Sequence, residues 1–136
     1  MKYILDRDTI SYLLKGDLSV RNKVQSIPIE SLCTTIINYS ELMYGIELEK
    51  SSRKIVKYIT ELLKAFEILQ YTSHAALIFA KTKAELKNKG ELIMDFDLMI
   101  ASIAIANKYT LVTNNEKHFQ RISSLKIENW SKHSDL

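Results

Sequence analysis

Short apolar segments alternate with longer helical segments along this 136-residue chain, and that alternation restricts the fold more than any other feature. The apolar segments cover residues 2–5, 29–35, 67–71, 110–113 and 125–129 and are short enough to be strands. Strands that alternate with helices form a mainly parallel sheet with helices on both faces. The sequence therefore predicts an α/β fold of three layers, α/β/α, around a central sheet.

The helical segments carry end signals in several places. Ser73 is the expected N-cap of a helix that carries Leu77, Ala80 and Ala84, and Gly90 is its expected end. Helices are expected at residues 9–16, 18–26, 36–50, 53–66, 73–90 and 95–109. The last of these is apolar on almost every side, which predicts that it lies buried in the middle of the fold.

Composition excludes several classes of protein. Hydrophobic residues make up 46% of the chain, with only three Gly and one Pro, so a disordered, collagen-like or disulfide-stapled chain is excluded. No linker, low-complexity tract or repeat is present, and we expect residues 1–136 to form a single domain. Cys33 lies in an apolar run and is expected to be a buried side chain without chemistry. The net charge of +3 permits a polyanionic partner without requiring one.

The first residues indicate where the protein works. They lack the apolar region of a signal peptide, and no window contains the roughly 18 apolar residues that a membrane span needs. We therefore expect a cytoplasmic protein with no membrane association.

Carboxylates follow the first predicted strand directly. The stretch YILDRDTI runs an apolar strand into Asp6, Arg7 and Asp8, and the strand at residues 110–113 leads to Asn115 and Glu116. Ligands of parallel sheets bind beyond the carboxyl ends of the strands. These two polar corners are therefore expected to meet at one edge of the sheet.

Two further acids stand beside apolar segments. Asp97 lies in the first turn of the buried helix, where Asp95 is better placed as the N-cap, so Asp97 is either a solvated residue or part of a site. Glu41 lies among Tyr39, Leu42, Met43 and Tyr44, in a setting that looks mostly buried. Burying an ionised carboxylate costs several kcal/mol or more unless a partner or a metal compensates. From the residues alone, a structural role for Asp97 and a site are about equally supported.

A divalent cation would remove the repulsion between such carboxylates. Hard oxygen ligands in an incomplete shell suit Mg²⁺ or Mn²⁺. Zinc has no recognisable ligand spacing, because His74, His118 and His133 are widely separated and the chain has one Cys. A metal that lowers the pKa of a bound water and neutralises a phosphate oxygen favours phosphodiester hydrolysis.

The motifs resemble PIN-domain ribonucleases of the VapC toxin type over nearly the whole chain. The resemblance rests on MKYILDRDTISYLLKG, YSELMYG, DLMIASIAIA and TLVTNNEKHF, four stretches in the family's order. These stretches place the family's first three acids at Asp6, Glu41 and Asp97. The fourth acid corresponds to Asn115, with Glu116 beside it as a substitute, and Arg7 stands where family members commonly carry Thr or Ser.

The resemblance implies a metal-dependent endoribonuclease, the toxin of a type II toxin-antitoxin pair. Asp6, Glu41, Asp97 and Asn115 would then be the catalytic set, with Asp6 and Asp97 as the principal ligands of Mg²⁺ or Mn²⁺. An RNA substrate, a cognate antitoxin that blocks the acidic pocket and a homodimeric assembly are implied as partners.

Two other readings of the same residues remain open. One is a PIN-like binding module with weak or no catalysis, in which the acids serve as caps and surface charge. The other, less favoured, is an aspartate-nucleophile phosphatase, because DRDTI superficially resembles that motif. Thr9 stands one position early for such an enzyme.

Overall fold

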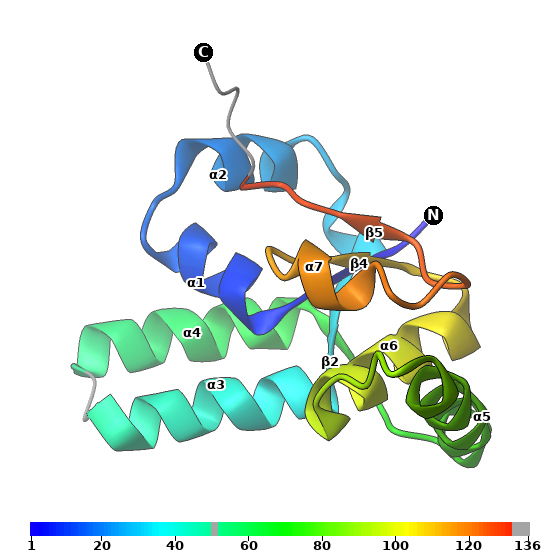
Figure 1. Cartoon of the computed structure of the whole chain (residues 1–136). Helices are drawn as coiled ribbons and strands as arrows, with labels where there is room; N and C mark the ends of the chain where they lie inside the picture. Colours follow the sequence, from blue (N-terminus) through cyan, green and yellow to red (C-terminus); the bar gives the residue numbers. More distant parts are fainter. Residues whose placement is uncertain (50–51, 132–136) are drawn as a thin grey trace.

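The computed structural model describes residues 1–49 and 52–131 (Figure 1). Lys50, the expected last residue of the helix at 36–50, and His133 lie outside the described residues. The strands are β1 (Tyr3–Leu5), β2 (Leu32–Thr35), β3 (Glu67–Leu69), β4 (Thr110–Val112) and β5 (Ile127–Glu128). The helices are α1 (Arg7–Leu14), α2 (Leu18–Gln25), the 3₁₀ helix η1 (Ile29–Ser31), α3 (Ile36–Glu49), α4 (Arg53–Ala65), α5 (Ser73–Lys89), α6 (Asp95–Asn107) and α7 (Glu116–Phe119).

The strands form one parallel sheet in the order β3-β2-β1-β4-β5. In the central register Ile4 lies beside Cys33 of β2 and Leu111 of β4. The carboxyl ends of β1 and β4 therefore lie next to each other. The predicted α/β class with a parallel sheet is confirmed.

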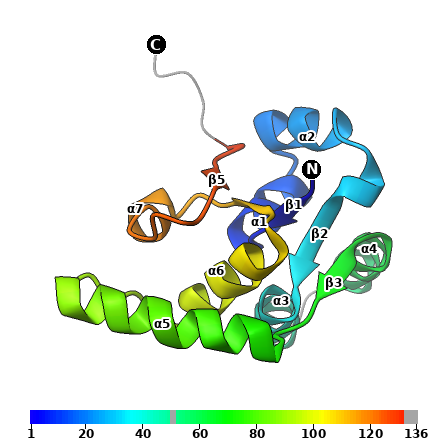
Figure 2. The same ribbon diagram turned by 90° about the vertical axis from the view of Figure 1, so that its right-hand side faces the viewer.

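The sheet separates two apolar cores, because neighbouring residues of a strand point to opposite faces. Ile4 and Leu111 pack with residues of α5, α6 and α7. Leu5 and Val112 pack instead with residues of α1, α2, α3 and α4. Full burial of one such side chain stabilises the fold by roughly 1.5 to 3 kcal/mol. Figure 2 shows α5 and α6 beside each other, away from α2 and α4, as a three-layer arrangement requires.

Helix α6 is buried along most of its length, as its sequence predicts. Its fully buried residues include Leu98, Ile100 and Ile103. Two predicted caps are wrong, however. Helix α5 is capped by the Thr72 side chain, which accepts a hydrogen bond from the Ala75 N–H, and α6 begins after Met94 without a side-chain cap.

The outer face of α5 carries apolar residues. Leu77 is 72% exposed, and Ala80 and Ala84 are exposed as well. The buried residues of this helix are instead Ala75, Thr82 and Leu86. Asp95, which was expected to cap α6, forms an ion pair with Lys83 of α5 at 2.9 Å.

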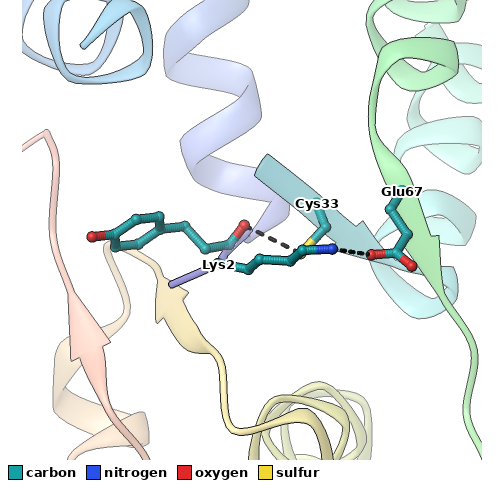
Figure 3. A network of polar contacts seen from close by, with 4 residues as sticks. Lys2, Cys33 and Glu67 are labelled. Carbon is teal, nitrogen blue, oxygen red and sulfur yellow. Dashed lines mark hydrogen bonds and ion pairs between the residues drawn. The ribbon is translucent and has the colours of Figure 1, made fainter. Parts of the chain in front are cut away.

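Cys33 is completely buried in β2, as expected from its apolar neighbours. Its thiol donates to the Tyr3 carbonyl oxygen at 3.3 Å, and burial raises its pKa to about 12. Beside it, Lys2 and Glu67 form an exposed ion pair of 3.2 Å (Figure 3). A thiol held in its neutral form in the core is a poor nucleophile, so Cys33 serves packing.

In the described part of the chain, every helix is too short or too polar to cross a lipid bilayer.

Two glycines allow a matched test of the backbone. Gly90 ends α5 with φ +68° and Gly45 lies inside α3, and a Cβ added at either position would meet nothing within 4 Å. We expect Gly90→Ala to lower the free energy of unfolding by about 1 kcal/mol, because L-residues avoid the left-handed region. Gly45→Ala should raise it by about 0.5 to 1 kcal/mol. Urea denaturation measures both, and a loss of stability in Gly45→Ala would contradict the described helix.

Candidate active site

Asp6 lies at the carboxyl end of β1 and is the most constrained polar side chain at this edge. It is only 7% exposed. Its Oδ1 atom accepts hydrogen bonds from the Asn38 amide at 2.6 Å and from the Arg7 backbone N–H at 2.9 Å. Its Oδ2 atom accepts one from the Thr113 hydroxyl at 2.7 Å. Both carboxylate oxygens are thus held by donors from α1, α3 and the residue after β4.

These donors are themselves fixed by neighbours. The Thr35 hydroxyl donates to Asn38 Oδ1 at 2.7 Å, so the Asn38 NH₂ group is the part that faces Asp6. The Asn115 backbone N–H donates to the Thr113 hydroxyl at 3.0 Å, which leaves that hydroxyl's proton for Asp6. The carboxylate is therefore positioned by two layers of hydrogen bonds, and its orientation is set before any ligand arrives.

Glu41 and Asp97 share the electrostatic field of Asp6. Burial raises the pKa of each, and the nearby charge of Asp6 raises it further. Asp97 contributes to the raised pKa of Glu41, whereas Arg7 lowers it. Burial also raises the pKa of Asp6, partly offset by its three hydrogen bonds. The three predicted acids are therefore gathered at one edge of the sheet.

Asp8 adds a fourth carboxylate to this group. Burial and then the charge of Asp6 raise its pKa to about 6, while a hydrogen bond of 3.2 Å from the Asn114 N–H opposes the shift. Four acids in one field repel each other strongly when all are ionised.

The surroundings of Glu41 are more open than the sequence suggested, and Asp97 is equally accessible. Glu41 lies in the middle of α3 and is half-buried, and Tyr44 beside it is 65% exposed. Asp97 lies in the first turn of α6, as predicted, and is also half-buried. Both carboxylates can therefore reach solvent, whereas Asp6 forms the floor of the site.

Asn115 and Glu116 are placed differently from each other. Asn115 lies next to Thr113, and its side-chain amide contacts His118 Nδ1 at 3.1 Å. Glu116 begins α7 and accepts a hydrogen bond from the Asn129 amide at 3.2 Å. Asn115 is thus linked to the Asp6 network through Thr113.

The donor set fits a hard divalent cation. Its charged groups are carboxylates, whose mutual repulsion a bound cation would relieve. Among residues 1–49 and 52–131, no three Asp, Glu, His or Cys side chains converge tightly enough to enclose an ion by themselves. Magnesium commonly keeps several waters and takes only one or two carboxylates, so an open site of this kind suits it. Asp6, Asp97 and Glu41 are the side chains that could hold the ion.

Three residues of the network were missed in the sequence. Asn38 lies one helical turn before Glu41, and this polar residue in an apolar run was a usable signal. Thr113 was assigned to the strand at residues 110–113, but it follows β4, and its hydroxyl donates to Asp6. His118 was considered only as a zinc ligand, but its Nδ1 atom contacts the Asn115 amide and its charge lowers the pKa of Asp97, so it lies close to the acids.

The chain is similar to known proteins over nearly its whole length. The family model of the PIN domain matches residues 3–125. Ribonuclease VapC2 of Rickettsia felis is 33% identical, and the match covers 97% of this chain and 100% of that protein. The tRNA(fMet)-specific endonuclease VapC of Salmonella typhimurium is 28% identical over 96% of this chain and 98% of its own length. The crystal structure of VapBC2 from Rickettsia felis, bound to a promoter DNA fragment, superposes with a TM-score of 0.88 at 32% identity and covers 96% of this chain and 99% of the matched chain.

Asn38 offers a direct test of the buried network. Asn38→Ala removes a donor from a buried carboxylate and leaves the Thr35 hydroxyl without its acceptor. We expect the free energy of unfolding to fall by about 2 to 3 kcal/mol. Thr60→Ala, which removes an exposed hydroxyl bonded to the Val56 carbonyl, should change it by less than about 0.5 kcal/mol. Equal effects of the two substitutions in urea denaturation would contradict the network.

Asp8 offers a test of the raised carboxyl pKa at this edge, which burial causes first and the charge of Asp6 second. Its pKa is raised in the folded protein from 3.8 to about 6, so its ionisation destabilises the fold as pH rises through that window. In EDTA, Asp8→Asn should be neutral near pH 4 and stabilising by about 1 kcal/mol at pH 7, a figure reduced for solvent contact. The exposed Asp95→Asn is the control. Thermal melts that show the same difference between Asp8→Asn and wild type at both pH values would contradict the raised pKa of Asp8.

Proposed function

Because this chain belongs to the PIN-domain family, we propose that it is a metal-dependent endoribonuclease that acts as the toxin of a type II toxin-antitoxin pair. The observation that carries the proposal is the shared electrostatic field of Asp6, Glu41 and Asp97 at the carboxyl ends of the strands. Residues 1–136 would act as one PIN-like domain.

The site residues would have different roles, metal binding for two of the acids and water binding for the others. Asp6 and Asp97 would be the principal ligands of Mg²⁺ or Mn²⁺, Asp6 offering the lone pairs that its protein donors leave free. A bound Mg²⁺ or Mn²⁺ supplies charge neutralisation at the phosphate and makes a water more acidic. Glu41, whose pKa is raised by burial, would hold the attacking water and accept its proton. Asn115 would orient a further water in place of a fourth acid.

The environment of Asp6 disfavours the phosphatase alternative. An aspartate nucleophile must present an oxygen to phosphorus, but Asp6 is 7% exposed and both of its oxygens accept hydrogen bonds. A carboxylate held this way is better suited to binding a cation than to attacking one substrate atom.

The names of the relatives support the choice of partners. Relatives are named ribonuclease and tRNA(fMet)-specific endonuclease, so RNA is the proposed substrate and that tRNA is the first structured RNA to assay. The similar structures from Rickettsia felis and Salmonella typhimurium are named VapBC. A cognate antitoxin is therefore proposed to neutralise this protein by blocking the acidic edge. We further propose a homodimer that acts in the cytoplasm.

Cleavage of RNA tests the proposed function. Purified protein should cleave RNA with Mg²⁺ or Mn²⁺ and stop in EDTA. Asp6→Ala and Asp97→Ala should each lower the initial rate at least about 100-fold, because they remove ligands of the ion. Asp95→Ala is the matched control, since Asp95 lies two residues away in the same helical turn and faces Lys83 at the surface.

The assay also separates an enzyme from a contaminant. Circular dichroism melts should show that Asp97→Ala and Asp95→Ala are both folded. If Asp6→Ala and Asp97→Ala cleave RNA at the wild-type rate, the activity does not come from this site. If folded wild-type protein cleaves neither tRNA nor unstructured RNA with either metal, the chain is a PIN-like binding module.

A further inference from the structure

Arg7 is an exposed cation directly beside the acidic edge. It is the first residue of α1, and its backbone N–H, not its side chain, holds Asp6. Its charge lowers the pKa of Asp6 and of Glu41, so the guanidinium lies near both acids. Within residues 1–49 and 52–131, however, Arg7 takes part in no ion pair. Its fork of donors therefore remains available to a ligand.

A cationic wall extends from Arg7 along α1. Arg7, Ser11, Leu14 and Lys15 recur at helical spacing and line one side of a groove of about 890 Å³ that also reaches Glu41. Arg7 and Lys15 are eight residues apart, so they lie roughly 12 Å apart along the helix axis. Positive charges at this spacing can contact separate phosphates of one strand.

Arg21 of α2 continues the same wall. Its Nη2 atom lies 3.1 Å from the position that a Cβ on Gly16 would occupy. Gly16 has φ +82°, so this turn between α1 and α2 suits glycine on two counts, its backbone conformation and the space that it leaves for Arg21. The turn thus brings the Arg21 guanidinium against Gly16, the residue that follows Lys15.

The two walls of the groove differ in charge. The wall from α1 and α2 contributes Arg7, Lys15 and Arg21 and no acid. The wall from α3 and α4 carries both signs, with the lining charges Glu41, Glu49, Lys54, Lys57 and Glu61. A polyanionic strand that follows the first wall passes three cations before it reaches the acidic edge, while Glu49 and Glu61 lie on the facing wall.

We propose that Arg7 is a phosphate-binding residue of this enzyme, and that Lys15 and Arg21 continue its contact along the backbone of a single-stranded RNA. This inference rests on the proposed function. Carboxylates repel the phosphates of RNA, and a guanidinium can bind a phosphate with two parallel hydrogen bonds. Arg7 would hold a phosphate next to the acids, and the strand would run along α1 toward α2.

Binding of a fluorescein-labelled single-stranded RNA oligonucleotide in EDTA tests the proposal without cleavage. Fluorescence anisotropy at several salt concentrations gives the slope of log K against log salt. Each lost phosphate contact on a single strand should reduce this slope by about 0.7. We expect Arg7→Gln to show that reduction and a roughly tenfold weaker affinity at low salt. Arg7→Lys should keep the wild-type slope, because it keeps the charge.

Lys126→Gln is the matched control for loss of one positive charge. Lys126 is exposed just before β5, at the amino edge of the sheet, so its slope and affinity should match those of wild type. Lys15→Gln should reduce the slope by about as much as Arg7→Gln, which tests the track along α1. If Arg7→Gln and Lys126→Gln have equal slopes and affinities, Arg7 does not bind phosphate.

A second readout separates phosphate binding from simple neutralisation of the acids. If Arg7 only offsets the charge of Asp6 and Glu41, Arg7→Gln would tighten Mg²⁺ binding in calorimetry and leave the RNA slope unchanged, which would overturn the proposal. Failure of the proposed function looks different. If wild-type protein cleaves no RNA but Arg7→Gln still reduces the salt slope by one phosphate contact, the nuclease proposal fails and the phosphate site is supported.

Discussion

The hydrogen bonds that hold Asp6 are the constraint on which the rest of the site depends. A carboxylate that is 7% exposed is tolerated only because Asn38, Thr113 and the Arg7 backbone N–H satisfy its oxygens. These donors come from three segments that are distant in the chain. The same contacts that make the buried charge acceptable therefore also join α1, α3 and the end of β4 at one edge of the sheet.

The electrostatics of this edge combine attraction for a cation with attraction for a polyanion. Asp6, Asp8, Glu41 and Asp97 share one field and resist full ionisation without a counter-charge. The charged residues that line the wall from α1 and α2 are all cations. An acidic edge beside a cationic wall suits a nuclease, because the carboxylates alone would repel the phosphates of RNA. Arg7 lies at the boundary between the two.

The sequence was informative where a pattern has one physical meaning. Alternating segments gave the parallel sheet, since the period of the apolar residues separates strands from helices. Asp6 and Asp97 could be proposed as site residues because Asp6 follows a buried strand and Asp97 lies in the first turn of a buried helix. Asn38 and Thr113 were missed, because an amide or hydroxyl in an apolar run has no visible partner until the fold supplies one. The capping predictions for Ser73 and Asp95 were wrong for a similar reason. Thr72 caps α5 in place of Ser73, and the Asp95 side chain pairs with Lys83 instead of capping α6.

We propose that Asp6 and Asp97 hold one divalent ion between them. Crystals grown with MnCl₂ and measured at the manganese absorption edge test it most directly, because the anomalous signal locates the ion without reference to activity. We expect a peak within coordination distance of both carboxylates, with waters completing the shell. A manganese peak bound elsewhere, with none beside Asp6 under saturating metal, would contradict it.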